Sequence, residues 1–241
     1  MRRFLRVAYA SYAAMTFLAL SLAALFAVIV TPGLERRRRI VRATSRLFLR
    51  LAGMPLVVRG IEQLPCGQCV VVANHASYLD GLVFSAALPP RFGFVIKREM
   101  AAVPLAGSML RRIGSEFVER FNRSKGASDA RRVLRNAANG HSLVFFPEGT
   151  FSTQPGLLRF HAGAFITAAR AGCPVVPAVV RGTRSALAPG RPLPRPALIE
   201  VEILPALIAT RAEPEAASAE LRERARAAIL SHLNEPDLAA A

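Results

Sequence analysis

The stretch VVVANHASYLD, residues 70–80, decides the fold and holds the first candidate functional residues. Its run from Val70 to Ala73 is short, apolar and mostly β-branched, which is typical of a strand buried on both faces in a parallel sheet. His75 follows this strand, and Asp80 comes five residues later, where a helix over 79–87 is expected. A turn between the two residues lets the carboxylate fold back onto the imidazole.

His75 and Asp80 are therefore candidate catalytic residues. A carboxylate bonded to Nδ1 fixes the imidazole tautomer and raises the basicity of Nε2, which makes the histidine a general base for a hydroxyl near neutral pH. An H-x-x-x-x-D spacing also arises by chance, and a His–Asp contact that only stabilises the turn is the alternative. We interpret the neighbouring Ser77 as a helix N-cap rather than a nucleophile.

A second polar turn follows a second apolar strand, in FFPEGTFS at residues 145–152. Glu148 and the Gly149-Thr150 turn stand just past the strand, where α/β folds place their ligand sites. Between the two turns, another expected strand ends in Arg120, a suitable partner for a phosphate.

Strands and helices alternate from residue 55 onward. Short β-branched runs bounded by turn residues predict strands at 56–59, 69–73, 93–96, 116–119, 143–146, 175–180 and 198–204. Helices are expected at 79–87, 100–112, 127–138, 163–171 and 215–233. This alternation predicts an α/β domain over residues 55–241, with a mixed, largely parallel sheet covered by helices.

An uncharged apolar segment precedes this domain. Val7–Val30 is 24 residues long, which as a helix is about 36 Å, and a bilayer core needs roughly 20 such residues. A secretory signal has a shorter apolar run and a small-residue cleavage site, whereas this run leads into a cluster of arginines. We therefore predict a membrane anchor within residues 1–54. The arginine excess at 36–50 favours a catalytic domain on the cytoplasmic face of the membrane.

The arginines after this segment recur with a helical period. Arg39, Arg42, Arg46 and Arg50 share one face, whereas apolar residues fall largely on the other. A basic amphipathic helix of this kind lies in the headgroup plane, with its arginines over anionic lipid. An ordinary domain helix with a solvated basic face is the alternative.

The composition agrees with a membrane location. The chain of 241 residues is 52% hydrophobic and carries a net charge of +16, and residues 1–60 hold eleven arginines and a single acid. This excludes intrinsic disorder and argues against a plain soluble enzyme. Aromatic residues are few, 7% with no Trp, which argues against nucleic acid as a partner. Cys66 and Cys69 form a lone C-x-x-C, which we interpret as buried thiols in a reducing compartment rather than as part of a metal site.

Four motifs occur in an order that resembles the glycerolipid acyltransferase family, which includes the bacterial 1-acyl-sn-glycerol-3-phosphate acyltransferases. They are Asn74-His75-x4-Asp80, Gly114-x2-Phe117-Val118-x-Arg120, Phe146-Pro147-Glu148-Gly149-Thr150 and Val176-Pro177. Lys97-x-Glu99 and Pro104-x-x-Gly107 resemble the family's segment between the first two motifs. The resemblance covers roughly residues 55–185, and four ordered motifs together are highly specific.

The resemblance implies a membrane-bound O-acyltransferase that moves an acyl chain from acyl-CoA or acyl-carrier protein to the hydroxyl of a lysolipid. It implies neither a cofactor nor a covalent intermediate. His75 would deprotonate the acceptor hydroxyl, and Asp80 would orient the histidine. Arg120 would hold the acceptor phosphate, Glu148 and the Gly149-Thr150 turn would line the acceptor pocket, and Val176-Pro177 would shape the acyl channel. The remaining expected substrate-binding residues are Asn74, Lys97 and Phe151.

Two positions depart from the family pattern. Members that act on lysophosphatidate usually carry Arg directly after the Glu-Gly-Thr, where this chain has Phe151, and a Lys commonly stands where it has His161. Arg120, Arg159 and Lys97 remain as candidate phosphate-binding cations. The expected acceptor is 1-acyl-sn-glycerol-3-phosphate, and another lysophospholipid or a lyso-ornithine lipid is the alternative.

Two other classes of function are weaker. A lipid hydrolase using Ser77 and His75 lacks the Gly-x-Ser-x-Gly turn that presents a nucleophilic serine. A non-enzymatic membrane-binding protein, built on the basic surface, would keep its function without His75.

Overall fold

The computed structural model describes residues 2–119, 123–191 and 193–239, so Arg120 lies outside the described residues. Strands β1 to β7 form one sheet in the order β1-β7-β6-β2-β5-β3-β4. The strands are β1 Leu56–Arg59, β2 Val70–Ala73, β3 Phe92–Lys97, β4 Glu116–Val118, β5 Ser142–Phe145, β6 Val175–Arg181 and β7 Ile199–Ile203. The α-helices are α1 Arg2–Val30, α2 Leu34–Leu51, α3 Asp80–Ala87, α4 Ala106–Arg112, α5 Arg123–Ala138, α6 Gly163–Ala171, α7 Thr183–Ala186 and α8 Pro214–Leu233, and the 3-10 helices are η1 Ile61–Gln63 and η2 Arg98–Ala102.

The sheet is mixed and largely parallel, which confirms the predicted fold class. β6, β2, β5, β3 and β4 all run in the same direction. β7 runs antiparallel to β6 and pairs in parallel with β1. The carboxyl ends of five neighbouring strands therefore meet at one edge, which we call the carboxyl edge.

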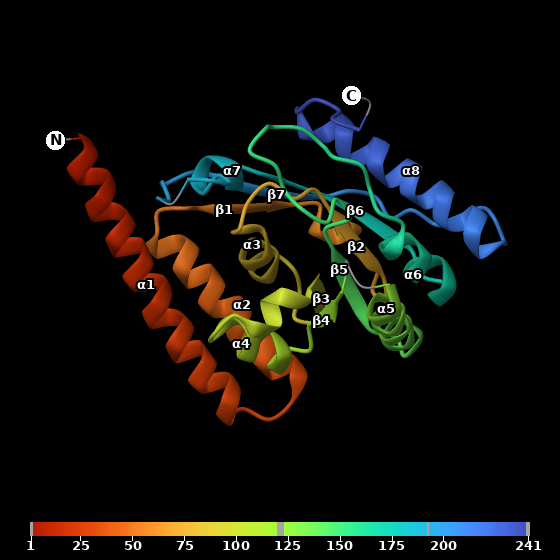
Figure 1. Cartoon of the computed structure of the whole chain (residues 1–241), viewed down its shortest axis with the longest axis horizontal. Coiled ribbons are helices and arrows are strands. Elements are labelled where there is room, and N and C mark those ends of the chain that lie inside the picture. Colours follow the sequence, from red (N-terminus) through yellow and green to blue (C-terminus); the bar gives the residue numbers. More distant parts are fainter. Residues whose placement is uncertain (1, 120–122, 192, 240–241) are drawn as a thin grey trace.

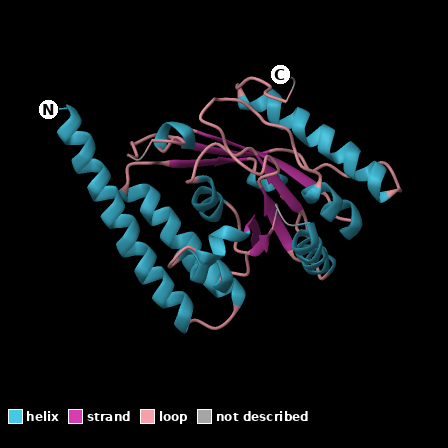
Figure 2. Cartoon of the chain, in the orientation of Figure 1, coloured by secondary structure: helices cyan, strands magenta, loops and turns pink. Residues whose placement is uncertain are grey.

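Helices cover both faces of the sheet. In Figures 1 and 2, α1 to α4 lie on one side, and α5, α6 and α8 lie on the other. The central strand β2 shows the cause: Val71 and Ala73 pack in a core with α2 and α3, whereas Val70 and Val72 pack in a core with α6 and α8. Burying a valine-sized side chain contributes about 1.5–3 kcal/mol. This two-sided burial is why the strand is a continuous apolar run rather than an alternating one.

Two local predictions are wrong. The helix expected over 100–112 is divided into η2 and α4, because Pro104 disfavours helical backbone at Val103, which is extended (φ −69°, ψ 122°). Leu105 then adopts a left-handed φ of 60° before α4 begins. Cys66 is exposed, in contrast to the buried Cys69, so only the second of these thiols is in the core.

α1 contains the predicted apolar segment. Within the described residues, one stretch, Phe4–Val30, is long and apolar enough to cross a membrane. Small residues such as Ala10 and Ala24 are buried on its inner side, whereas Phe4, Met15 and Phe26 are 75%, 65% and 69% exposed. The helix thus leaves large apolar side chains on the surface, which is unusual in a protein surrounded by water.

The basic face of α2 is divided between the domain and the surface. Arg46 Nε donates to the carbonyl oxygen of Ala86 at 2.8 Å, so this arginine contacts the α/β domain, although the residue is exposed. Phe48 and Leu49 bury the opposite face in the core beside α3. Arg39 and Arg50 are exposed. α2 is therefore both part of the domain and a carrier of exposed positive charge, although Arg39 pairs with Glu35 at 3.2 Å.

Candidate active site

The predicted His–Asp pair forms where β2 reaches the carboxyl edge. His75 Nδ1 lies 2.7 Å from Asp80 Oδ2, and the same oxygen accepts the backbone N–H groups of Ala76 and Ser77 at 2.7 and 2.9 Å. The Asp80 side chain is fully buried, whereas that of His75 is 19% exposed. Because Nδ1 is bonded to the carboxylate, Nε2 is the ring nitrogen left for chemistry.

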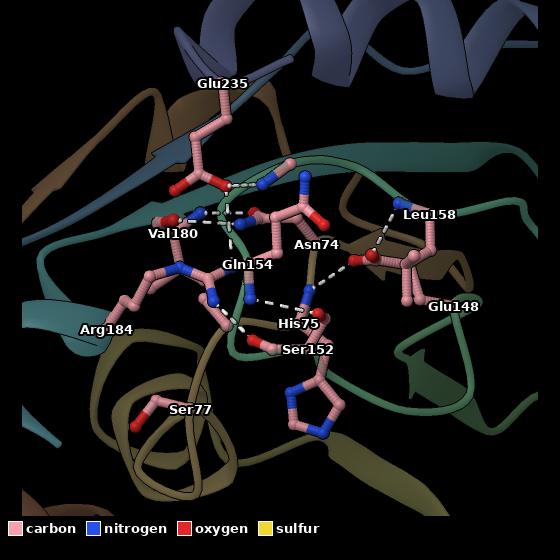
Figure 3. Close-up of polar contacts among 12 residues, drawn as sticks. Asn74, His75, Ser77, Glu148, Ser152, Gln154, Leu158, Val180, Arg184 and Glu235 are labelled. Atoms are coloured by element: carbon pink, nitrogen blue, oxygen red, sulfur yellow. Dashed lines mark hydrogen bonds and ion pairs between the residues drawn. The ribbon is translucent and has the colours of Figure 1, made fainter. Parts of the chain in front are cut away.

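Ser77 is not a helix N-cap, and its hydroxyl is bonded away from the histidine. α3 begins at Asp80 with Leu79 at the N-cap position. The Ser77 hydroxyl donates to the carbonyl oxygen of Leu187 at 2.6 Å and accepts the N–H of Leu79 at 3.1 Å. Figure 3 shows this hydroxyl pointing away from the His75 ring. The N-cap interpretation is therefore wrong.

Asn74 connects β2 to β6 directly beside the histidine. Its Nδ2 donates to the carbonyl oxygen of Val180 at 3.0 Å, and its Oδ1 accepts the N–H of Val180 at 2.8 Å (Figure 3). Asn74 is only 3% exposed, so these bonds form in a nonaqueous environment. Pro177 lies further inside the sheet, opposite Val72 on β2. Asn74 thus holds the backbone at the point where His75 leaves the strand.

Glu148 connects the histidine turn to the loop after β5, residues 147–162, which we call the active-site loop. Its Oε1 accepts the N–H of His75 at 2.6 Å, and its Oε2 accepts the N–H of Leu158 at 2.9 Å (Figure 3). The residue is 4% exposed. Burial raises the pKa of Glu148 to about 7, although the two N–H groups favour the ionised form.

Aromatic rings enclose the His75 imidazole. Phe146 stacks on His75 with ring centroids 4.5 Å apart and planes inclined by 22°. Phe151 meets the imidazole edge-on at 4.4 Å and meets Tyr78 edge-on at 4.7 Å. Tyr78 is 68% exposed. An apolar ring therefore contacts His75 at the position where the resemblance leads us to expect an arginine.

The other predicted residues are distributed around the same edge. Gly149 adopts a left-handed φ of 74° and donates its N–H to the carbonyl oxygen of Phe146 at 3.0 Å, which forms the tight turn after Glu148. Lys97 is exposed at the end of β3. Thr150, Arg159 and His161 are also exposed.

Three residues at the site were missed by the sequence reasoning: Phe146, Tyr78 and Arg184. Arg184 on α7 donates through Nη1 to the carbonyl oxygen of Ser152 at 2.5 Å (Figure 3). The available signal was its position just after β6, because the carboxyl ends of parallel strands meet at one edge. In the part of the chain that the structure describes, there is no group of three or more His, Cys, Asp or Glu side chains that could hold a metal.

A comparison with known families identifies the class of protein to which this fold and candidate site belong. The sequence model described as "Acyltransferase" matches residues 55–181, more than half of the chain. The chain therefore belongs to the acyltransferase family.

Relatives and a solved structure agree with this assignment. The chain is 34% identical over 148 residues to the 1-acyl-sn-glycerol-3-phosphate acyltransferase of Neisseria meningitidis. The matched region covers 61% of this chain and 57% of that protein. It is 33% identical over 144 residues to the lyso-ornithine lipid O-acyltransferase of Pseudomonas aeruginosa, covering 58% and 53%. The chain thus spans about half the length of the curated relatives it matches. The crystal structure of the LPA acyltransferase PlsC from Thermotoga maritima has the same fold, with a TM-score of 0.79 and 20% identity over 95% of this chain and 96% of that one.

Proposed function

We propose that the protein transfers an acyl chain from acyl-CoA or acyl-carrier protein to the hydroxyl of 1-acyl-sn-glycerol-3-phosphate, giving phosphatidate, with His75 as general base. The observation that carries the proposal is the 2.7 Å contact between His75 Nδ1 and the buried Asp80 carboxylate. The name of the Neisseria meningitidis relative supports the acceptor. Lys97 and Arg120 are the cations that we assign to its phosphate.

In this mechanism, His75 Nε2 takes the proton of the acceptor hydroxyl as its oxygen attacks the thioester carbonyl carbon. A C–O bond forms, and the carbonyl electron pair moves onto oxygen. When the intermediate collapses, the C–S bond breaks and the leaving thiolate receives the proton from His75. The Asp80 charge stabilises the imidazolium between these steps, because a fully buried carboxylate is poorly screened by water. No covalent acyl-enzyme forms.

We place this reaction at the cytoplasmic face of the bacterial inner membrane. The exposed apolar side chains of α1 enter the bilayer, and exposed arginines such as Arg39 and Arg50 on α2 lie over anionic headgroups. This location gives the site access to a lipid acceptor from one side and to a water-soluble acyl donor from the other.

Membranes that contain the full chain, labelled acyl-CoA or acyl-carrier protein, and a panel of lysolipids test the proposal. We expect labelled phosphatidate with lysophosphatidate, and a decrease of at least ~10²-fold in the His75→Ala variant, the typical contribution of a general base. His141→Ala is the matched control, because His141 is exposed beyond the end of α5. Undiminished product with His75→Ala would overturn the mechanism.

Acyl transfer to a different lysolipid is the second candidate, and the position of Phe151 favours it. The Phe151 ring stands 4.4 Å from the imidazole and offers no hydrogen bond to a phosphate. Aromatic faces such as those of Phe151 and Tyr78 instead attract ammonium groups. A lyso-ornithine lipid carries such a group, and one relative is named as its acyltransferase.

The variant Phe151→Arg separates the two acceptors. If the wild type prefers a lyso-ornithine lipid, the new guanidinium should raise kcat/KM for lysophosphatidate relative to that lipid by ~10-fold or more, since a hydrogen bond to a charged group is worth ~1.5–3 kcal/mol. Phe151→Leu, which keeps an apolar side chain, should leave the ratio near its wild-type value. A ratio that is the same in all three proteins would exclude Phe151 as a determinant of acceptor choice.

A further inference from the structure

The carboxyl-terminal residues 234–239, which we call the C-terminal segment, pair with the active-site loop. Leu157 N donates to the carbonyl oxygen of Pro236 at 2.9 Å, and Leu238 N donates to that of Leu157 at 3.0 Å. Gly156 allows this approach, because with φ of 143° a Cβ there would collide with the side chain of Leu238. The segment lies outside residues 55–181, the part of the chain that the family model matches.

An ion pair joins this segment to the loop through α7. Glu235 Oε2 accepts the N–H of Gly156 at 2.7 Å and lies 3.5 Å from Arg184 Nη2. Arg184 Nη1 donates to the carbonyl oxygen of Ser152 at 2.5 Å. Figure 3 shows Arg184 reaching Ser152 from one side and Glu235 approaching the loop from above. The two side chains are 15% and 24% exposed, so water screens this pair less than one on the open surface.

Arg184 bonds to Ser152, which is next to Phe151, the loop residue that contacts the His75 imidazole. Phe151 precedes Ser152, and its ring is packed between His75 and Tyr78. We propose that Arg184 and Glu235 are positioning residues of the acyl transfer: by fixing the carbonyl of Ser152, they hold Phe151 against His75 and set how the acceptor hydroxyl meets the base. This inference rests on the proposed function, because it takes His75 as the base.

Direct binding of the acceptor by Arg184 is the competing role, and the contacts of Arg184 argue against it. Its Nε is buried without a hydrogen-bond partner within the described residues, and both Nη atoms already contact protein oxygens. The Arg184 side chain is also only 15% exposed, so a phosphate has little access to the N–H groups that remain. The charge of Arg184 also acts on the buried Glu148 carboxylate, where it opposes part of the pKa rise that burial causes.

A double-mutant cycle in the full chain tests the proposal. Arg184→Gln and Glu235→Gln should each lower kcat/KM for the lysolipid acceptor by ~10-fold, since a misplacement of about 1 Å costs up to 10²-fold, while KM for the acyl donor stays within about twofold. In a Phe151→Ala background, the same two substitutions should have little further effect, because nothing remains for them to position. Arg184→Lys, which keeps the charge, should recover part of the loss.

Glu202→Gln is the matched control. It removes an ion pair with Arg181, 2.6 Å long and with both side chains 27% exposed, that does not touch the active-site loop. We expect wild-type kinetics from it. Unchanged kcat/KM in Arg184→Gln or Glu235→Gln would overturn the proposal, as would losses that add fully to that of Phe151→Ala.

Failure of the proposed function gives a different result. If His75→Ala retains activity while the cycle is non-additive, the positions of Arg184 and Glu235 still matter but His75 is not the base. If His75→Ala is inactive and the cycle is additive, the mechanism stands and the positioning role is wrong. Thermal unfolding of each variant in detergent identifies any that fail to fold, and Glu235→Gln then carries the test if Arg184→Gln is unstable.

Discussion

Asp80 concentrates its hydrogen bonds on one carboxylate oxygen. Oδ2 accepts His75 Nδ1 and two backbone N–H groups, whereas the buried Oδ1 has no hydrogen-bond partner among the described residues. An amide oxygen in place of Oδ2 keeps all three contacts, so Asp80→Asn removes the charge and little of the geometry. We expect kcat in steady-state acyl transfer to fall by ~10²–10⁴-fold, because the imidazolium loses its stabilising charge.

Ser77→Ala is the control for this variant. The Ser77 hydroxyl bonds the backbone of Leu187 and Leu79, so its removal should cost about 1–2 kcal/mol of unfolding free energy while acyl transfer continues. An inactive Ser77→Ala beside an active Asp80→Asn would indicate a serine nucleophile and contradict the general-base mechanism.

Glu148 gives the folded protein a specific pH dependence. Its folded pKa of about 7 lies above the ~4.3 of an unperturbed glutamate. The folded state therefore binds this proton more tightly, and the stability from the group is full below pH ~4 and is lost as pH rises through ~7. Between these two pH values, the unfolding free energy of the wild type should fall by up to ~3 kcal/mol relative to that of Glu148→Gln, which has no proton to release. Unfolding of both proteins in detergent at pH 5 and pH 8 measures the difference, and parallel pH curves would contradict it.

At the scale of single residues, the sequence predicted which residues lie close together, but only some of the hydrogen bonds between them. The strand-turn-helix pattern around residues 70–80 was enough to predict the contact between His75 and Asp80, because the two residues are close in the sequence. Glu148 was predicted near the site, yet both of its oxygens accept backbone N–H groups from residues 73 and 10 positions away. Such bonds depend on which amides the folded loops present, and that is not a property of residue type.

At the scale of elements, strands and helices were predictable because their hydrophobic periods differ and turn residues separate them. The order of the strands was not predictable, because β2 pairs with strands that are distant in the sequence. Val70 of β2 lies opposite Leu143 of β5 on one side and Val175 of β6 on the other. The link from Arg184 to Glu235 was missed for the same reason: 51 residues separate the pair, and it forms only when the segment after α8 returns to the carboxyl edge.

Arg38 is the residue through which α2 is attached to the domain. Its guanidinium donates to the carbonyl oxygens of Arg91 at 2.7 Å and Ile113 at 2.9 Å, and burial lowers the pKa of Arg38. Gly93 leaves room for it, since a Cβ there would lie 2.9 Å from Arg38 Nη2. Arg38→Met keeps the apolar stem and leaves both carbonyls unpaired, so we expect a loss of ~3 kcal/mol or more in unfolding free energy.

Denaturant unfolding in detergent checks this prediction. Arg36→Met is the matched control, because Arg36 is exposed on the same helix, and surface substitutions usually change stability by no more than about 0.5 kcal/mol. Equal stability of the two variants would mean that α2 is held by its apolar face alone.

At the scale of the whole molecule, charge and apolar surface are both concentrated at the amino-terminal end. Residues 1–60 carry eleven arginines and a single acid, and α1 exposes its large apolar side chains beside them. The α/β domain itself buries its apolar residues on both faces of the sheet. The two parts of the chain therefore have different preferred surroundings, which is what the proposed location at a membrane surface requires.

A triple variant of α1 tests this arrangement. Phe4, Met15 and Phe26 are each at least 65% exposed, and each should contribute about 1.5 kcal/mol or more on entering lipid. Changing all three to Ser should therefore lower the partition of the full chain into anionic vesicles by ~10³-fold, measured by flotation after dilution from detergent. The control changes Leu193, Leu198 and Ile208 to Ser, since these exposed apolar residues lie outside α1. Equal binding of the α1 variant and the wild type would contradict the membrane role of α1, as would an equal loss in the control.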